Sequence, residues 1–360
     1  MLYLKKISLF QFKNYDSRQW HFTESVTGIC GSNGTGKTNL LDAIYYLCFT
    51  KSYFARQDIV AVQQKKKGMR LEGIFRIGEQ EFETIAILRE NNKKEFLLNQ
   101  EPYKKFSEHI GRFPCVMIAP DDVAVVTGLS EERRRLIDTI IAQYNFEYLE
   151  GLIQYNKLLQ QRNSLLKQIA ETGQYDTDLL EAIDTQFVHY GNIIYKTRKV
   201  FTNTFIPTIL ENYQSIAGSE DGITISYISQ LNEMSLQDLL KSSLQKDMVL
   251  QKTNSGIHKD DLEICMQESS FKNRASQGQR KTLLLAIKLA EFSVLKQEKQ
   301  VAPILLLDDV FEKLDEQRMH QLFYKVCVQE KCQVFITDTH AERLNDYLKK
   351  MRVNFSLITL

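Results

Sequence analysis

The feature that most constrains this chain is the stretch GSNGTGKTN at residues 31–39. It follows the apolar run VTGIC and precedes an apolar stretch that ends near residue 49, so it lies between a short strand and a helix. The pattern G-x-x-x-x-G-K-[ST] lets backbone N–H groups surround phosphate oxygens, and the helix adds its positive N-terminal end. Because strand and helix stand where this mechanism needs them, the stretch predicts a nucleotide-binding loop rather than a glycine-rich turn with an accidental lysine.

The side chains of this loop are expected to hold a nucleotide and its metal ion. Lys37 should reach the β- and γ-phosphates, and the Thr38 hydroxyl should bind Mg²⁺. The predicted nucleotide-binding residues are Gly31, Ser32, Asn33, Gly34, Thr35, Gly36, Lys37, Thr38 and Asn39.

Composition restricts the class of protein. The chain of 360 residues has 46 basic and 45 acidic residues, so any nucleic-acid surface must come from local clustering. No apolar segment is long enough to cross a membrane, and lysines interrupt the first apolar run, unlike a signal peptide. The six cysteines form no C-x-x-C pair, which indicates free thiols in a reducing compartment. We expect a soluble, cytoplasmic protein with no membrane partner.

The middle of the chain differs from its two ends. The first part, up to about residue 125, has strand-like runs around one helix, and the last part again alternates helices with strands. Between them, residues 130–210 have apolar side chains at spacings of three and four, which predicts two helices joined by a turn near 171–176. The apolar stripes are wider than a coiled-coil seam, so we expect a compact helical subdomain.

Two adjacent acids, Asp308 and Asp309, follow the apolar run ILLL. A carboxylate at the end of a buried strand can hold Mg²⁺ while its neighbour orients or deprotonates the attacking water. We therefore expect Asp308 on the metal side and Asp309 in the catalytic position; the alternative is two acids that make turn contacts. The place of Asp309 is often occupied by Glu in efficient hydrolases, so its shorter side chain predicts slow turnover.

A second anion-binding pattern, ASQGQRK at 275–281, opens a strongly amphipathic helix. It resembles the signature motif of ABC-type ATPases, whose S-G-G-Q places are held here by Ser276, Gln277, Gly278 and Gln279. The second place departs from the transporter pattern, which has glycine. The alternative is an ordinary N-capped helix. The downstream FEKLD, which ends at Asp315, resembles the D-loop of the same ATPases.

This resemblance implies a fold, an assembly and a cofactor. The expected class is α/β: an ABC-type P-loop ATPase head, split into N- and C-terminal halves, with an inserted helical subdomain. The predicted parts are 1–125 with the phosphate loop, the mostly helical insertion 126–250, and 251–360, which completes the ATPase. In ABC-type ATPases the signature of one subunit faces the ATP held by another. Single copies of each motif therefore imply a homodimer that forms on binding ATP with Mg²⁺.

The length of the insertion restricts which class of ABC-type ATPase the chain resembles. Lys37 and Ser276 are 239 residues apart (276 − 37), much farther than in transporter subunits. Nearly the whole chain resembles the RecF family of bacterial recombination and replication-repair proteins. The similar stretches are LFQFKNY at 9–15, GSNGTGKTNLLDAIYYL at 31–47, APDDVAVVTGLSEERRRLID at 119–138, LLQQRNSLLK at 158–167, SGIHKDDLEI at 255–264, SQGQRKTLLLAIKLAE and ILLLDDVFEKLD. Several of these are not generic ABC motifs.

The resemblance implies a dimer that binds duplex DNA, particularly at gaps and single-strand/duplex junctions, with slow, DNA-stimulated ATP hydrolysis. It also implies a part in recombinational repair and replication restart after DNA damage, in which RecO and RecR help to load RecA. The alternative is an ABC-type ATP-binding subunit of another SMC-like or transporter system. The long spacing between the two motifs argues against a transporter subunit. An SMC-like ATPase with a fused nuclease would need a further acidic metal cluster, for which residues 258–261 are a weak candidate.

Two family positions depart from the ABC pattern. ABC-type ATPases have a glutamine that senses the γ-phosphate, and the segment MIAPDD at 117–122 stands in its place here. Gln160 or Gln161 could serve as the sensing glutamine instead, or could equally be solvated helix residues. The switch histidine has a candidate in His340, which is either a phosphate contact or the residue that starts a helix; 337–338 could take its place.

The predicted DNA-binding residues are clustered lysines near loop tips: Lys65, Lys66, Lys67, Lys93 and Lys94. Each cluster could instead be a solvated face. Arg133–Arg135 form a further basic cluster, for which pairing within the chain is the rival interpretation. The residue types of the motif at 258–261 do not indicate its role. The hypotheses are that it senses the nucleotide or that it braces the signature helix.

Overall fold

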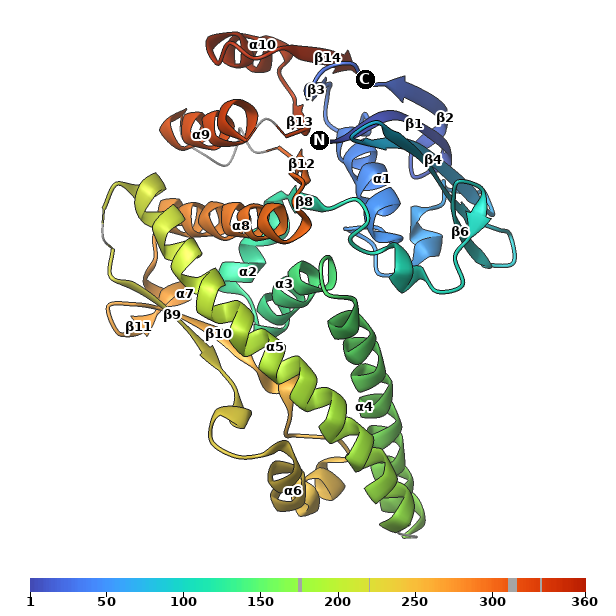
Figure 1. Cartoon of the computed structure of the whole chain (residues 1–360), viewed down its shortest axis with the longest axis vertical. Helices are drawn as coiled ribbons and strands as arrows, with labels where there is room; N and C mark the ends of the chain where they lie inside the picture. Colours follow the sequence, from blue (N-terminus) through green and yellow to red (C-terminus); the bar gives the residue numbers. More distant parts are fainter. Residues whose placement is uncertain (174–176, 220, 310–315, 331) are drawn as a thin grey trace. The chain divides into compact units, whose positions relative to one another are not determined.

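The computed structural model describes residues 1–173, 177–219, 221–309, 316–330 and 332–360, without the side chains of 316–318. The chain forms two compact units, Met1–Asp122 with Leu284–Leu360, and Val123–Leu283 (Figure 1). The sequence predicts boundaries after residues 125 and 250, whereas the chain returns to the first unit at Leu284, inside the helix α8 (Gln277–Lys299). The residues that follow 250 therefore lie first in the second unit.

A parallel sheet in the described part of the first unit carries the predicted nucleotide motifs. Its five strands lie in the order β14 (Phe355–Thr359), β3 (Val26–Cys30), β13 (Val334–Asp338), β12 (Ile304–Leu307) and β8 (Cys115–Ile118). All except β14 are buried along their whole length, as expected for strands covered on both faces. Cys30 pairs in register with Asp338, and Leu307 with Ile336 and Ile118. The carboxyl ends of these strands therefore meet at one edge, where open α/β sheets bind ligands.

The helix α1 (Lys37–Phe49) packs against strands of this parallel sheet and of an antiparallel sheet. The antiparallel sheet has the order β2 (Tyr15–His21), β1 (Leu2–Phe12), β4 (Met69–Ile77), β5 (Gln80–Leu88), β6 (Lys94–Leu98) and β7 (Glu101–Pro102). Every residue of α1 except Thr38 and Asn39 is buried. A helix that is apolar on nearly all sides is typically buried, as this one is between the two sheets.

The rest of the first unit covers the parallel sheet with helices. The helix α9 (Glu316–Phe323) is followed by a π-helical turn, Tyr324–Gln329. The last helix, α10 (Ala341–Lys350), lies between β13 and β14 in the chain and packs on β3 and β14. No helix in the described ranges is long and apolar enough to span a membrane.

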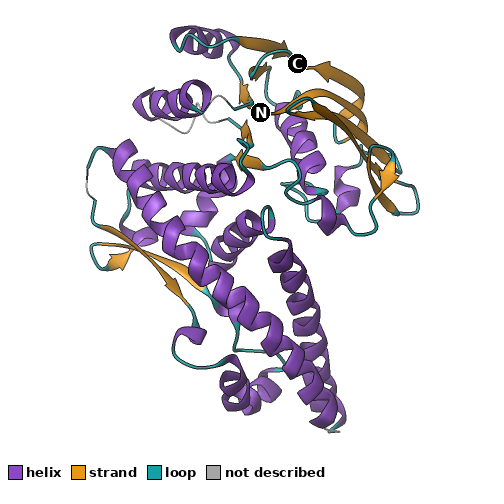
Figure 2. Ribbon diagram, in the orientation of Figure 1, coloured by secondary structure: helices purple, strands orange, loops and turns teal. Residues whose placement is uncertain are grey.

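The second unit is built around two long helices, α4 (Phe146–Thr172) and α5 (Thr177–Ala217), which lie side by side as predicted (Figure 2). The Asn145 side chain caps α4 by accepting a hydrogen bond from the Tyr148 N–H, and Gly173 ends it with φ 68°. The shorter helices are α2 (Ala124–Thr127), α3 (Ser130–Ala142), α6 (Leu236–Leu250) and α7 (Phe271–Arg274). A small sheet, β11 (Ser269–Ser270), β10 (Asp261–Met266) and β9 (Ile223–Ile228), was not predicted.

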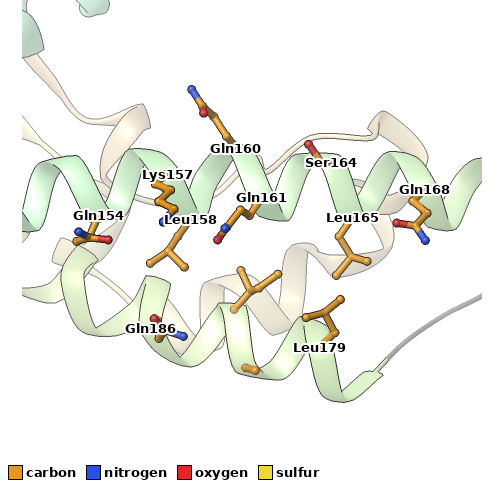
Figure 3. A pocket seen from close by; sticks show the side chains of 12 residues that line it. Gln154, Lys157, Leu158, Gln160, Gln161, Ser164, Leu165, Gln168, Leu179 and Gln186 are labelled. Atoms are coloured by element: carbon orange, nitrogen blue, oxygen red, sulfur yellow. The ribbon is translucent and has the colours of Figure 1, made fainter.

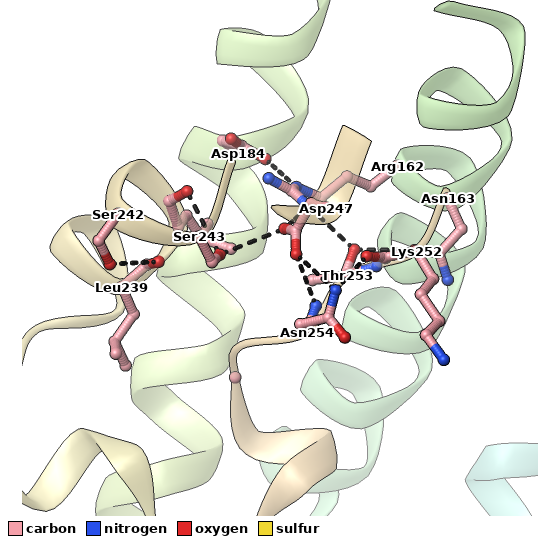
Figure 4. Close-up of polar contacts among 12 residues, drawn as sticks. Arg162, Asn163, Asp184, Leu239, Ser242, Ser243, Asp247, Lys252, Thr253 and Asn254 are labelled. Atoms are coloured by element: carbon pink, nitrogen blue, oxygen red, sulfur yellow. Dashed lines mark hydrogen bonds and ion pairs between the residues drawn. The ribbon is translucent and has the colours of Figure 1, made fainter. Parts of the chain in front are cut away.

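Buried arginines hold these elements together. Arg162 on α4 is fully buried, and its guanidinium donates to Asp184 on α5 at 2.7 Å and to Asp247 on α6 at 2.7 Å (Figure 4). The Asp247 carboxylate also accepts hydrogen bonds from the Asn254 backbone and side chain, both at 2.9 Å. Removing one partner of such a buried pair typically costs about 3–5 kcal/mol, because a charge is left without compensation.

The motif at 258–261 belongs to a second buried cluster of the same kind. Arg198 on α5 donates to Asp138 at 2.8 Å and to Asp260 at 2.9 Å. Arg133 donates to Asp261 at 2.6 Å. Arg134 donates to the Asp260 carbonyl oxygen at 2.6 Å, so these two basic residues pair within the chain. The motif therefore ties α3 and α5 to β10, which leads through α7 into the signature helix.

Two histidines, His109 and the half-buried His258, have matching hydrogen bonds, one in each unit. In the second unit, His258 Nε2 lies 3.1 Å from the Thr253 carbonyl oxygen, and Nδ1 lies 2.8 Å from the Tyr155 hydroxyl. In the first, His109 Nε2 lies 2.7 Å from the Leu47 carbonyl oxygen. A carbonyl oxygen only accepts, so Nε2 carries the proton in both rings. Burial lowers the pKa of His258 and of His109 to about 4 in each case.

These shifts predict a loss of stability in mild acid. Between pH 6.5 and 4 the unfolded chain binds protons at these rings that the folded chain does not, so stability falls as the pH falls. Each histidine should contribute a loss of about 2 kcal/mol between pH 7 and pH 5. Urea unfolding of His258→Gln should show a lower stability at pH 7 and a shallower dependence on pH than the parent chain. Replacing the exposed His21 by Gln is the control; an unchanged pH slope in His258→Gln would contradict the assignment.

Candidate nucleotide site

The loop after β3 has backbone conformations that only glycine adopts readily. Gly34 has φ 84° and Gly36 has φ 112°, both in the left-handed region. A Cβ on Gly36 would also lie 2.5 Å from the Asn14 side-chain nitrogen and 2.7 Å from the Tyr15 hydroxyl oxygen. The first unit therefore requires glycine at this position for two independent reasons.

Lys37, the first residue of α1, is buried with its ammonium group against the loop. Its Nζ donates to the carbonyl oxygens of Gly31 at 2.8 Å and Ser32 at 3.1 Å. The helix N-terminus and this ammonium together place positive charge within the loop, as phosphate binding requires.

Three residues from distant parts of the chain meet at the carboxyl edge of the parallel sheet. The Thr38 hydroxyl lies 3.0 Å from both carboxylate oxygens of Asp308, and the Thr337 hydroxyl lies 2.8 Å from one of them. Burial raises the pKa of Asp308, while the hydrogen bonds from Thr337 and Thr38 act in the opposite direction. The structure thus brings together the two predicted metal ligands, Thr38 and Asp308, and adds Thr337.

The donor set of this junction fits Mg²⁺. A hydroxyl and a carboxylate are the hard oxygen ligands that Mg²⁺ prefers, and Mg²⁺ usually completes its shell with water and substrate phosphates. In the described ranges, no group of three His, Cys, Asp or Glu residues could hold a metal ion.

Asp309, the predicted catalytic residue, is the next residue along the chain. Its backbone N–H donates to the Thr337 hydroxyl oxygen at 2.9 Å, and its φ of 46° is left-handed. Asp adopts this region more readily than most residues, and such strain persists where the surroundings fix the backbone. Thr337 therefore holds both acids, although the sequence suggested it only as a substitute for the switch histidine.

The region of the switch histidine is organised by Asp338, the buried last residue of β13. Its carboxylate accepts from the His340 backbone N–H at 3.0 Å and from Arg343 at 2.5 Å. His340 stands at the N-cap of α10 with its side chain 70% exposed. The structure thus places it at a helix start, and its phosphate contact remains a prediction. Asp315 lies outside the described residues.

The signature segment begins α8 in the second unit as a reciprocal capping box. The Ser276 hydroxyl oxygen accepts from the Gln279 N–H at 3.2 Å, and the Gln279 side-chain oxygen accepts from the Ser276 N–H at 2.9 Å. Ser276 and Gln277 are exposed, and Gly278 is half-buried. The two interpretations of this motif, an N-capped helix and an anion site, are therefore compatible. The capping box leaves Ser276 exposed at the N-terminus of the helix.

The segment predicted to stand in place of the sensing glutamine belongs to a buried charged network. Asp122, just after β8, accepts hydrogen bonds from the Tyr53 hydroxyl and, at 2.9 Å, from the Ala119 N–H, and it lies 3.5 Å from the Lys288 ammonium. Lys288 lies on α8, 3.3 Å from the buried Glu291. Burial acts to lower the pKa of Lys288, but Asp122 and Glu291 outweigh it and raise that pKa.

The two alternative glutamines lie elsewhere, as exposed residues of α4. Gln160 and Gln161 line an open groove of about 770 Å³ between α4 and α5 in the second unit (Figure 3). Gln161 lies on the side of α4 that faces α5, and Gln160 points away from it. Nothing in the described contacts distinguishes either glutamine from a solvated helix residue.

Comparison with known proteins identifies the family. A family model described as the RecF/RecN/SMC N terminal domain matches residues 3–357. A protein of Parabacteroides distasonis named DNA replication and repair protein RecF is 41% identical over 98% of this chain and 96% of its own length. The RecF protein of Flavobacterium johnsoniae is 39% identical over the full length of both chains. The chain belongs to the RecF family.

Solved structures agree with this membership. A RecF structure described as "recombination mediator protein RecF-ATPrS in RecFOR pathway" superposes with a TM-score of 0.87 at 30% identity, covering 94% of this chain and 93% of the other. The Smc head domain of Pyrococcus furiosus has a TM-score of 0.55 at 18% identity, which shows a shared fold only. The predicted fold, an ABC-like ATPase head with a helical insertion, is confirmed.

The predicted DNA-binding lysines of this RecF-family chain differ in their surroundings. Lys65, Lys66 and Lys67 are exposed, and the nearest acids to the last two are Asp16 at 3.8 Å and Glu90 at 3.9 Å. Exposed pairs at such distances are weak, so these ammonium groups stay available to phosphates.

The two lysines of the second cluster, Lys93 and Lys94, differ in their exposure to solvent. Lys93 is exposed and lies 3.4 Å from Glu95. The Lys94 side chain is only 14% exposed, lies 2.9 Å from Asp58, and stands over the rings of Tyr46 and Phe106 at 5.1 and 5.2 Å. Lys94 therefore stabilises the first unit through an ion pair and cation–π contacts, which the sequence did not indicate.

Proposed function

We propose that this RecF-family chain is an ATP-dependent switch that binds DNA. ATP binding joins two copies on duplex or gapped DNA, and hydrolysis separates them. The observation that carries the proposal is the junction of Thr38, Asp308 and Thr337 directly beside the phosphate loop. It is the arrangement that an ATPase of this family needs to bind Mg²⁺ and a triphosphate together.

Each residue of the junction has a role that follows from its position. The loop N–H groups and Lys37 bind the phosphates, and Thr38 with Asp308 holds Mg²⁺. Bound Mg²⁺ would neutralise negative charge on the phosphates. Asp309, fixed through its backbone by Thr337, orients the attacking water. Its side chain is one methylene shorter than Glu, which favours slow hydrolysis suited to a switch.

The signature motif completes the site of a second copy. Ser276 and Gln277 are exposed at the start of α8, so they can face a phosphate held by another chain, together with Gly278 and Gln279. Two composite sites would then bridge the dimer, and Asp315 and His340 would contribute from the same interface. ATP is therefore part of the dimer interface in this proposal.

Dimerisation gives the sharpest test of the ATP switch. With a non-hydrolysable ATP analogue, the parent chain should sediment as a dimer. Lys37→Ala should remain monomeric because it does not hold the triphosphate. Ser276→Arg should bind the analogue normally yet remain monomeric, because a bulky cation replaces the contact with the partner's phosphate. Ser242→Arg, at another exposed serine of the second unit, is the matched control. Normal dimers from both Lys37→Ala and Ser276→Arg would overturn the proposal.

The biological setting proposed is that of the relatives. The solved RecF structure is described as a mediator in the RecFOR pathway. We propose that this chain acts in the cytoplasm with RecO and RecR to load RecA at gaps, in recombinational repair and replication restart. DNA phosphates would lie against Lys65, Lys66, Lys67 and Lys93, whereas Lys94 supports the same face from within.

Salt dependence tests the DNA surface. Replacing Lys65, Lys66 and Lys67 together by Gln should flatten the plot of log affinity against log salt for duplex DNA by about 0.9 per lost contact. Lys241→Gln with Lys246→Gln, two exposed lysines of α6, should leave the slope unchanged.

Gapped, duplex and single-stranded DNA should be compared with and without ATP; equal binding to all three, regardless of nucleotide, would remove the DNA-switch function while leaving the fold intact.

A further inference from the structure

The turn between β1 and β2 touches the nucleotide loop through consecutive residues that the proposed function does not use. Phe12 ends β1 and Tyr15 begins β2, and the two pair across the hairpin. Lys13 and Asn14 form the turn between them. Each of Lys13, Asn14 and Tyr15 contacts a different part of the phosphate loop or of α1.

Asn14 joins the middle of the loop to the first turn of α1 with one side-chain amide. Its nitrogen donates to the Thr35 carbonyl oxygen at 2.9 Å, and its oxygen accepts from the Asn39 side chain at 2.8 Å. Thr35 lies in the loop, and Asn39 lies in the first turn of α1. The amide therefore fixes the distance between the loop backbone and the helix that begins at Lys37.

Tyr15 supports the next residue of the loop. Its hydroxyl donates to the Gly36 carbonyl oxygen at 3.0 Å. Burial raises the pKa of Tyr15 to about 12, so the hydroxyl keeps its proton at neutral pH. Its ring packs edge-on against Trp20 at 5.3 Å, which holds the side chain independently of the hydroxyl.

Lys13 attaches the same turn to the body of α1. Its ammonium lies 2.6 Å from the carboxylate of Asp42, which is fully buried and also accepts from Ser52 and from the Tyr53 N–H, both at 2.7 Å. Gln11 and Lys13 have φ of 51° and 49°, left-handed values on either side of Phe12. Such backbone persists only where surrounding contacts fix it, so the conformation of the turn depends on its contacts.

The other side of this turn is hydrogen-bonded to the segment that carries the exposed lysines. The Lys13 N–H donates to the Ala61 carbonyl oxygen at 2.8 Å, and the Gln63 N–H donates to the Gln11 carbonyl oxygen at 2.8 Å. Phe12 and Val62 form a β-bridge between these bonds. Lys65, Lys66 and Lys67 follow two residues later. One short segment of backbone thus contacts the phosphate loop and residues 61–63, which lead into the exposed lysines 65–67. We call residues 65–67 the lysine loop.

We propose that the turn Lys13–Tyr15 couples the lysine loop to the nucleotide site, with Asn14 and Tyr15 as positioning residues. The proposal rests on the proposed contact of Lys65–Lys67 with DNA. Phosphates bound there favour one arrangement of 61–63, the paired backbone of Gln11 and Lys13 follows it, and Asn14 and Tyr15 transmit it to Thr35 and Gly36. Because coupling between two binding sites is reciprocal, DNA should tighten the binding of ATP by the same factor as ATP tightens the binding of DNA.

A thermodynamic cycle tests this coupling in the full chain. The affinity for a non-hydrolysable ATP analogue is measured with and without saturating duplex DNA, and the affinity for DNA with and without the analogue. The parent chain should show a coupling factor of at least about fivefold in both directions. Asn14→Ala should bind the analogue several-fold more weakly, keep its DNA affinity in the absence of nucleotide, and reduce the coupling factor to near one.

A second variant and a control keep the result interpretable if Asn14→Ala folds poorly. Tyr15→Phe keeps the ring packing on Trp20 and loses only the hydroxyl hydrogen bond, so its coupling factor should fall between those of the parent chain and Asn14→Ala. Ser17→Ala, an exposed position on the same strand, should leave coupling unchanged.

The outcomes that overturn the coupling proposal differ from those that overturn the proposed function. Folded Asn14→Ala or Tyr15→Phe with the coupling factor of the parent chain would overturn the role of the turn alone. DNA binding without any coupling in the parent chain would also overturn this inference but leave the DNA-binding surface intact. Absence of DNA binding, or binding unaffected by removing Lys65–Lys67, would remove the proposed surface itself.

Discussion

The hydrogen bonds that two threonines make to Asp308 are the interaction on which the rest of the site depends. A buried carboxylate is costly unless hydrogen bonds compensate it, and here Thr38 and Thr337 do so. These residues come from the first helix and from the last third of the chain. Forming the junction therefore requires the two ends to build one parallel sheet, with the intervening residues excluded from it.

The insertion meets this requirement by folding on its own core. Arg162 and Arg198 are buried with their acidic partners inside the second unit, so these ion pairs use no residue of the nucleotide edge. The chain returns through α8, which begins with the signature and continues to Lys288 and Glu291, buried in the first unit with Asp122. A single helix thus begins with the predicted contact to a partner's phosphate in the second unit and ends in the first unit.

Local sequence patterns were enough to predict the motifs that lie in short stretches of the chain. They were not enough to predict contacts that form only when distant strands pair. The loop at Lys37 and the acids after ILLL were predicted because spacing and strand context specify them locally. Thr337, Asn14 and Tyr15 act across strand pairs and hairpin turns, so no local pattern identified their contacts. Lys94 shows the same limit: in sequence it belongs to a basic pair, and only packing on Tyr46 and Phe106 shows that it is mostly buried.

We propose that Thr38 and Asp308, from the two ends of the chain, form one Mg²⁺–ATP site. Calorimetric titration with ATP, in the presence of Mg²⁺ and of a chelator, tests it most directly. The parent chain and Asp309→Asn should bind more tightly with Mg²⁺, whereas Asp308→Asn should bind with equal affinity in both conditions. An undiminished Mg²⁺ dependence in Asp308→Asn would contradict the account.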